Sequence, residues 1–365
     1  MMTAMMPALE LFIDTNILLL LAYGFWWVAQ TALQRSGLRH NFPLQLRILK
    51  TTLVLTMLSP LMALAAVTAS QALWPQTPIT IGDIAVAAYL RGDIAIPAVE
   101  FEALLNTRSR TLEALFDSHG AWLIGLALAA AAGAAAQAAM TLRSAIKLRR
   151  AIAHSYLWRQ TRTTEIRVSD TVTVPFAARG LTRRYVVLPS SLVTHPRDLR
   201  LILAHEFQHL RGGDVEWELA FEAMRPLLYW NPAFLMWKRA FNRLRDLACD
   251  QSVVTRRRIT AGAYADCLVD FCERRIRTQA PRAMRVAFLQ TGSRNARRMF
   301  EDRILALEHI PTGARKRAAA VMLTVLLAFG ISLAAASVRQ SGDWSQDRLM
   351  LSTVVNLERL EARGF

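Results

Sequence analysis

The sequence predicts a multi-pass α-helical membrane protein of four spans, with a mixed α+β domain between the third and fourth spans. Three observations predict this fold class. Hydrophobic residues make up 53% of the 365 residues, and the mean hydropathy is +0.23. Four segments have the roughly 20 mainly apolar residues that a bilayer crossing requires. Between the last two segments lies a long basic stretch in which β-branched strand patterns precede amphipathic helix patterns.

The first three predicted spans fall within residues 1–142, and the four lie at about 11–33, 51–74, 121–142 and 318–338. The third is rich in alanine, and small residues allow helices to pack closely in a membrane. A soluble alanine-rich helix is the alternative for that segment. A signal peptide is the alternative for the first, but such peptides begin with positive charge and no Lys or Arg precedes Arg35.

The charges between the spans predict their orientation. The loop at 75–120 holds three Arg against six acidic residues, whereas 143–317 holds 33 of the 44 Lys+Arg and 16 of the 28 Asp+Glu. The positive-inside rule then places both termini and the 75–120 loop outside, and 143–317 in the cytosol. Residues 339–365 become a short outside tail. A basic cytosolic domain suits contact with anionic membrane lipid.

Nucleic-acid binding and structural disulfides both fit the sequence poorly. The basic clusters at 255–260 and 294–298 are short and lack interleaved aromatic residues, so we expect no direct nucleic-acid binding. Cys249, Cys267 and Cys272 all lie in the predicted cytosolic domain, where a reducing environment disfavours disulfides. Their spacing also fits no zinc site made of cysteines alone.

The cytosolic stretch contains the sequence ILAHEFQHLRGGD within a predicted helix. That helix begins near Pro196 and ends at the Gly212–Gly213 pair, and further helices are expected at 214–229, 233–254, 261–278 and 295–308. Residues four apart face the same way on a helix. His205 and His209 can therefore present two imidazole nitrogens to one metal ion.

The motif predicts hydrolytic zinc chemistry at about one zinc per chain. Two histidines and a carboxylate leave the fourth position of zinc open, which is typical of catalytic rather than structural sites. Zinc lowers the pKa of its water to about 7, and Glu206 beside the histidines is placed to take the proton. Three fixed residues occur by chance in roughly one chain in a hundred of this size, so an ordinary histidine pair on a helix is the alternative.

Carboxylates elsewhere are candidates for the rest of the site. Asp246 and Asp250 lie one helical turn apart, a spacing that suits one carboxylate on the metal and one behind it. A solvated acidic face beside Arg243 and Arg245 is the alternative. Asp214 is placed either to accept the second N–H of a ligand histidine or to cap the next helix.

Substrate contacts are also expected. Residues 164–193 are predicted to form two or three short strands, after a basic helix that runs to about Trp158. Pro175 indicates an edge strand or a bulge. Because an edge strand can hold an extended peptide by strand addition, we expect the substrate beside Val174, Pro175 and Phe176. Tyr264 and Tyr229 are candidates to stabilise an oxyanion, and nothing in the sequence selects between them.

Five motifs in order carry a family resemblance: VSDTVTVPFAARG, YVVLPSSLV, LRLILAHEFQHLRGGD, LLYWNPAFLMW and LRDLACDQSVV. The chain resembles the BlaR/MecR-type integral-membrane zinc metallopeptidases over most of residues 1–338. The resemblance implies a gluzincin-like peptidase domain in the cytosol of a bacterium, between spans three and four of its inner (plasma) membrane. It makes His205 and His209 zinc ligands and Glu206 the catalytic base.

The chain departs from the family in two places. The family takes its third ligand from the Glu of Glu-x-x-Cys-Asp, where this chain has Asp246, which is one methylene shorter. Its helix must then lie closer to the metal, or the metal is bound more weakly. The antibiotic sensors of the family also carry a large outside penicillin-binding domain, for which residues 339–365 are too few, so we expect no direct β-lactam sensing. Apolar positions in the tail predict a docking helix.

Three functional hypotheses follow. The first is an endopeptidase that cleaves a cytosolic protein, which the family implies is a transcriptional repressor, or that cleaves itself; this hypothesis allows a homodimer. The second is a catalytically impaired signalling scaffold of the same fold, with Asp246 as its sign. The third is a transporter or channel, which requires ionisable residues within the spans, and the spans hold few besides Asp14.

Overall fold

The computed structural model of the chain describes residues 2–36, 38–73, 81–104, 120–180, 182–257, 259–279, 301–307, 316–338 and 346–362. The predicted helix at 295–308 is therefore described only in its second half, and the basic cluster at 294–298 lies outside the described residues. The chain divides into two compact units. One comprises Met1–Phe25, Thr52–Gly133 and Val325–Phe365, and the other Trp26–Thr51 and Ala134–Thr324.

The predicted spans coincide with long helices: α1 (Met2–Arg35), α2 (Phe42–Leu73), α5 (Gly120–Ala153) and α13 (Lys316–Val338). Within the part of the chain that the structure describes, two stretches are long and apolar enough to cross a membrane, Phe12–Arg35 and Gly125–Ala153. A shorter apolar helix covers Val321–Ala335. Length and composition thus identify two candidate membrane helices.

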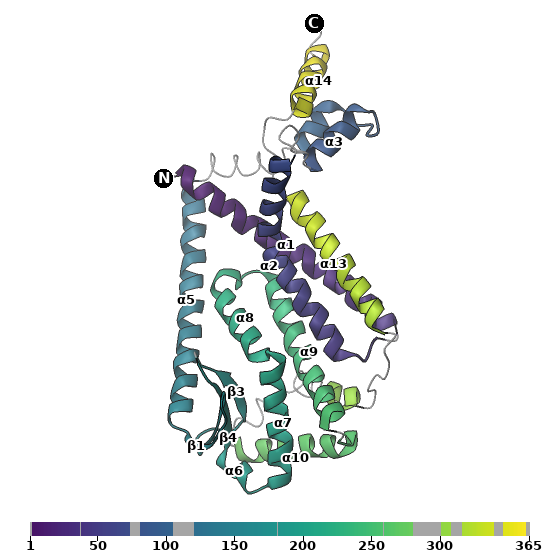
Figure 1. Cartoon of the computed structure of the whole chain (residues 1–365). Helices are drawn as coiled ribbons and strands as arrows, with labels where there is room; N and C mark the ends of the chain where they lie inside the picture. Colours follow the sequence, from purple (N-terminus) through teal and green to yellow (C-terminus); the bar gives the residue numbers. More distant parts are fainter. Residues whose placement is uncertain are drawn as a thin grey trace. The chain divides into compact units, whose positions relative to one another are not determined.

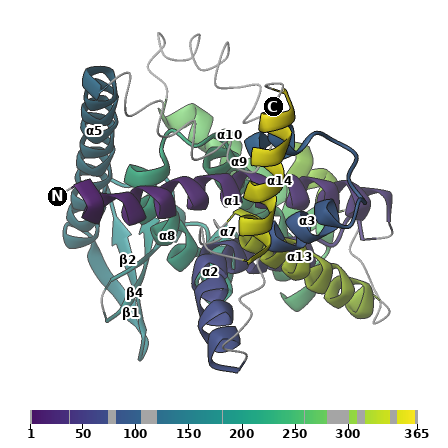
Figure 2. The ribbon, with the colours of Figure 1, turned by 90° about the horizontal axis from the view of Figure 1, so that it is seen from above.

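In the first unit, the tail forms helix α14 (Gln346–Ala362), which packs on α3 (Ile81–Leu90) and on the helical residues 98–104 (Figures 1 and 2). A small core joins them: Val86, Ala98, Phe101, Leu351 and Val355. The Val99 amide donates to the Glu358 carboxylate at 3.1 Å. The docking helix predicted in the tail is thus present, and its partner is the segment between the second and third predicted spans.

The second unit contains a four-stranded sheet of order β1-β2-β4-β3, and its strands are β1 (Tyr156–Gln160), β2 (Thr164–Ser169), β3 (Phe176–Arg179) and β4 (Arg184–Pro189). The central pair β2–β4 is parallel and the outer pairs are antiparallel. β3 is an edge strand, as Pro175 indicates. The prediction that the basic helix runs to about Trp158 is wrong: α5 ends at Ala153, because the next residues pair with β2, which suits their aromatic side chains.

Helix α7 (Pro196–Gly212) lies against this sheet after the short helix α6 (Ser190–Val193) (Figure 1). Its apolar face meets the strands in one core cluster: Ile166, Val186, Leu188, Leu192, Leu199, Ile202 and Leu210. Each such buried aliphatic side chain contributes about 1.5–3 kcal/mol, so the cluster fixes the rotation of α7 about its axis. The histidines, on the remaining surface of the helix, are thereby turned away from the sheet core.

Three helices follow near the predicted positions: α8 (Asp214–Leu228), α9 (Pro232–Arg257) and α10 (Ala261–Gln279). Aromatic rings pack α8 on α9, with Phe221 and Phe241 5.1 Å apart between ring centroids. A second cluster joins α7, α9 and α10: Ala204, Cys249, Val253, Val254, Tyr264 and Leu307. These contacts place the middle of α9 and the start of α10 beside the histidines of α7.

Candidate metal centre

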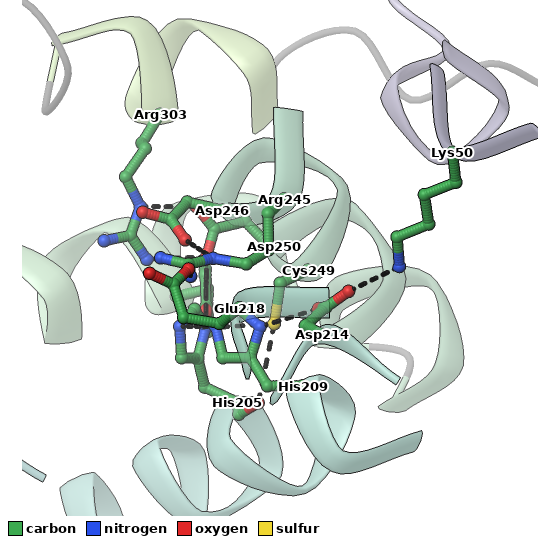
Figure 3. A network of polar contacts seen from close by, with 11 residues as sticks. Lys50, His205, His209, Asp214, Glu218, Arg245, Asp246, Cys249, Asp250 and Arg303 are labelled. Carbon is green, nitrogen blue, oxygen red and sulfur yellow. Dashed lines mark hydrogen bonds and ion pairs between the residues drawn. The ribbon is translucent and has the colours of Figure 1, made fainter. Parts of the chain in front are cut away.

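The two histidines of α7 face a common point. The Nε2 atoms of His205 and His209 lie 3.0 Å apart, and their rings are nearly perpendicular, at 89°. Both side chains are only partly buried. The predicted pairing of residues one helical turn apart is therefore present in the geometry (Figure 3).

The other nitrogen of the His209 ring contacts a carboxylate. Its Nδ1 lies 2.9 Å from Asp214 Oδ2. Asp214 returns to the helix it follows because Gly213 adopts a left-handed conformation, with φ of 68°. A Cβ at Gly212 would meet both Asp214 carboxylate oxygens at 3.2 Å, so this close approach favours glycine there. Asp214 thus contacts His209 and is the first residue of α8, but the expected capping role is wrong, because the N-cap is Gly213 and no side-chain cap hydrogen bond forms.

His205 is held in the same manner from α9 and α10. Its Nδ1 lies 3.0 Å from the Tyr264 hydroxyl and 3.3 Å from Asp250 Oδ1. The Tyr264 hydroxyl donates to Asp250 at 2.8 Å, which leaves its oxygen to accept from the imidazole. These contacts suit an Nδ1–H donor on each ring, which leaves each Nε2 to face the shared point.

The paired lone pairs fit a metal ion. Two Nε2 atoms 3.0 Å apart can share a proton in a hydrogen bond, or each can direct a lone pair at one metal ion. Two nitrogens that bind one tetrahedral zinc at about 2.0–2.1 Å lie about 3.3–3.4 Å apart. A shift of a few tenths of an ångström would therefore accommodate zinc, with both Nδ1 atoms already engaged by hydrogen-bond acceptors.

Asp250 is a fully buried anion, at 0% exposure. Burial raises the pKa of its carboxyl, but the Arg303 guanidinium, in contact at 2.6 and 2.8 Å, outweighs burial and holds that pKa well below its usual value. Asp214 is similar: burial opposes ionisation, but hydrogen bonds from His209 and Lys50 lower its pKa. Each histidine therefore has a charged carboxylate behind it.

Asp246, the predicted third ligand, has a different partner. Its Oδ1 lies 2.9 Å from Arg245 Nε, and Arg245 also contacts Glu218 at 3.0 Å. Among the described residues, the group able to hold a metal is His205, His209 and Cys249, with ligand atoms within 4.8 Å of one another. Asp246 is not in that group, because the neighbouring guanidinium engages its carboxylate.

Cys249 of α9 is the third member of that group. Its Sγ lies 3.4 Å from His205 Nδ1, the ring nitrogen turned away from the shared point. Burial, then the nearby Asp250 carboxylate, raises the pKa of the thiol well above its usual value. Sequence reasoning considered only sites made of cysteines and so missed a mixed site. The available signal was its position three residues after Asp246, on the same face of α9.

Glu206 is placed as the motif predicts, next to His205 on α7, with 8% of the residue exposed. Within the described part of the chain, no hydrogen bond or ion pair engages its carboxylate. The Glu206 carboxylate, which the predicted chemistry requires as a base, is therefore not paired with a cation among these residues.

The tyrosines do not fit the predicted oxyanion role. Tyr264 is 1% exposed and its hydroxyl lies between His205 and Asp250, so it supports a ligand rather than facing a substrate. Tyr229 caps the far end of α8 from Asp214, about 22 Å away along a helix axis that rises roughly 1.5 Å per residue. Both positions argue against contact with a reacting carbonyl.

The expected substrate strand lies at the edge of the sheet. Phe176 begins β3 and pairs with Val187 of β4, while Val174 and Pro175 precede the strand. Ala177 of β3 packs against the core shared with α7. The edge strand and the helix that carries the histidines are therefore neighbours, which is the arrangement that strand addition of a peptide would need.

Comparison with known families identifies the chain. The family model described as BlaR1 peptidase M56 matches residues 100–300, which is more than half of the sequence. The chain belongs to the BlaR1 peptidase M56 family. A search of curated proteins finds no match.

Membership of the BlaR1 peptidase M56 family makes the chain a membrane-associated metallopeptidase. Peptidases of this family are typically zinc-dependent, which agrees with the donor set on α7. The matched region covers the third predicted span, the sheet and helices α7 to α10.

Proposed function

We propose that this chain is a zinc-dependent endopeptidase of the bacterial inner membrane. The observation that carries the proposal is the pair of Nε2 atoms 3.0 Å apart, each on a ring whose Nδ1 contacts a buried carboxylate. Such outer contacts fix the tautomer of a ligand histidine and raise its basicity.

His205 and His209 would hold about one zinc ion per chain. When bound, zinc supplies a Lewis acid for hydrolysis of a peptide bond. Glu206, whose carboxylate meets no cation among the described residues, accepts a proton from the attacking water and later gives it to the leaving amine. The edge of β3 binds the substrate backbone in extended form. Asp214, Asp250 and Tyr264 keep the imidazoles oriented and do not touch substrate.

We assign the third ligand to Asp246, after release from Arg245. Their ion pair is partly buried, with side-chain exposures of 25% for Arg245 and 21% for Asp246. Binding of a divalent cation by Asp246 requires that its carboxylate exchange the contact with Arg245 for the metal. Cys249 is the alternative, but its protonated thiol lies at the Nδ1 side of His205.

Substitutions distinguish these two ligands. We expect Asp246→Ala to raise the zinc dissociation constant at least about tenfold, or 1.4 kcal/mol, and Asp246→Glu, which restores the family's longer carboxylate, to lower it. Cys249→Ala should leave it within about threefold. The constants are measured by competition with a chromophoric chelator. A large loss with Cys249→Ala and none with Asp246→Ala would assign the ligand to the thiol instead.

The proposed architecture has four spans, with residues 1–142 and 318–338 in and around the membrane and a gluzincin-like domain at 143–317 in the cytosol. The charge distribution between the apolar helices supports it. Its substrate would be a cytosolic protein, with a transcriptional repressor suggested by the family resemblance, or the chain itself. Membrane lipid is a further partner, and a homodimer is compatible with this arrangement.

Topology reporters test the orientation. A reporter that works only in the cytosol should be active when it is fused after Gln160, because the basic residues of 143–317 resist translocation. A reporter that works only outside should be active when it is fused at residue 340. The reverse pattern would place the peptidase domain outside and remove every cytosolic protein from its substrates.

A catalytically impaired scaffold is the second candidate function. The observation that favours it is the contact between Asp246 and Arg245, which leaves the metal group of the described residues without a carboxylate. Metal content separates the two functions. A scaffold would purify without zinc, and Glu206→Gln would change nothing that the protein does.

A further inference from the structure

Lys50 links helix α2 to the candidate metal centre. Its Nζ donates to Asp214 Oδ1 at 2.8 Å and to the Gly212 carbonyl oxygen at 3.0 Å (Figure 3). Lys50 belongs to the same compact unit as the sheet and α7, as do all of residues 26–51. Helix α2 continues beyond it without a break to Leu73, through the second predicted span.

The Lys50 contact is built into the interior rather than lying on the surface. The side chain of Lys50 is 15% exposed and that of Asp214 only 6%. The ammonium also lies 5.6 Å from the centroid of the Phe241 ring and 5.9 Å from that of Trp217. A buried ion pair is strongly disturbed when one partner is removed, because the other charge stays desolvated. The Lys50 ammonium is therefore a buried charge that depends on the Asp214 carboxylate.

Asp214 has one oxygen for each neighbour. Oδ1 accepts from Lys50, and Oδ2 accepts from His209 Nδ1. The carboxylate cannot turn toward one without changing its contact with the other. Lys50 also binds the Gly212 carbonyl, in the last turn of the helix that carries His209. A cation at the carboxyl end of a helix is favourable for the helix dipole.

A second contact fixes the beginning of helix α2. The Gln251 amide donates to the His40 carbonyl oxygen at 2.8 Å, and its oxygen accepts from the Phe42 amide at 3.3 Å. Gln251 is 2% exposed and follows Asp250 directly. Residues 40–50 are thus held at two points. Their beginning is bonded to Gln251 of α9, next to Asp250, and their end is bonded to Asp214.

We propose that Lys50 is a positioning residue of the metal centre, which acts through Asp214 to orient His209 and so ties the zinc affinity of the site to helix α2. This inference rests on the proposed function. It assigns to α2, the helix of the second predicted span, a direct part in the peptidase site.

The direction of the change in zinc affinity when Lys50 is removed distinguishes a positioning role from a purely electrostatic one. A nearby positive charge repels a divalent cation, so removal of Lys50 would tighten zinc binding if charge alone mattered. If Lys50 positions Asp214, its removal leaves the carboxylate free to rotate, and His209 loses its orientation. Zinc binding is then weakened, because ligand orientation by such outer contacts is typically worth about 10–100-fold in metal affinity.

The test is a double-mutant cycle on the purified full chain in lipid nanodiscs, with the zinc dissociation constant as the readout. We expect Lys50→Met to weaken zinc binding about tenfold or more, and Lys50→Arg to stay within about threefold of wild type. In an Asp214→Asn background, Lys50→Met should have an effect below about twofold, because the pathway is already broken. Lys50→Gln serves the same comparison if Lys50→Met does not fold.

The matched control is Arg167→Met. Arg167 is a partly buried cation, 19% exposed, paired with Glu165 at 2.9 Å on β2, so its loss disturbs folding similarly without reaching the histidines. It should not change zinc affinity. Equal or tighter binding by Lys50→Met, or an undiminished effect in the Asp214→Asn background, would overturn the inference while leaving the zinc site intact. A wild-type chain that binds no zinc would overturn the proposed function and this inference together.

Discussion

Glu206→Gln is expected to abolish peptide cleavage while zinc binding and folding persist. The substitution keeps the size of the side chain and removes only its capacity to accept a proton, which contributes typically 10²–10⁴-fold in such reactions. Glu206 has no ion pair or hydrogen bond to lose among the residues described by the structure, so its replacement costs no contact. Its burial to 8% exposure also accommodates the uncharged amide readily.

The measurement compares wild type and Glu206→Gln at equal expression, by sequencing the protein N-termini that appear in the cells. Fragments found only with wild type identify substrates, including the chain itself. Asp270→Asn is the control, since it removes one carboxylate from α10 in the same conservative way. If wild type and Glu206→Gln produced the same fragments, and another substitution removed those fragments, the catalytic base would be a residue other than Glu206.

The double variant His205→Ala, His209→Ala is expected to lose its zinc completely. Both ring nitrogens that face the shared point disappear, and neither Asp246 nor Cys249 can hold a metal ion alone. Elemental analysis should give about one zinc per wild-type chain and none for the variant, because three protein ligands are the usual minimum of a catalytic site. His195→Ala is the control, since His195 lies before α7 and contacts Thr194 and Ser191. Zinc retained by the double variant would place the site elsewhere.

The fold around the histidines could be predicted because its signals are local. Pro196 and the Gly212–Gly213 pair mark both ends of α7, and the apolar positions between them give the face that meets the sheet. Pro175 indicates the edge strand for the same reason, since proline has no backbone N–H to donate to a neighbouring strand. Strand β1 was missed because Tyr156 to Trp158 continue a helical pattern until β2 pairs with them.

The outer contacts of the site could not be predicted in the same way. Arg303 reaches Asp250 from 53 residues away, and Lys50 reaches Asp214 from 164 residues away, and no spacing rule connects such positions. Asp246 is a different case: the sequence shows Arg245 beside it, but not that the guanidinium contacts its carboxylate. Long-range ion pairs depend on which helices pack together, which only the tertiary structure determines.

The most direct test follows hydrolysis by one purified sample of the full chain through removal and return of zinc. The substrate is a pooled library of unstructured peptides, and Glu206→Gln is treated in parallel. We predict that chelation stops cleavage by wild type, that about one equivalent of zinc restores it, and that Glu206→Gln binds the returned zinc without cleaving. Cleavage that survives complete removal of zinc, or that is equal in wild type and Glu206→Gln, would contradict the proposed peptidase.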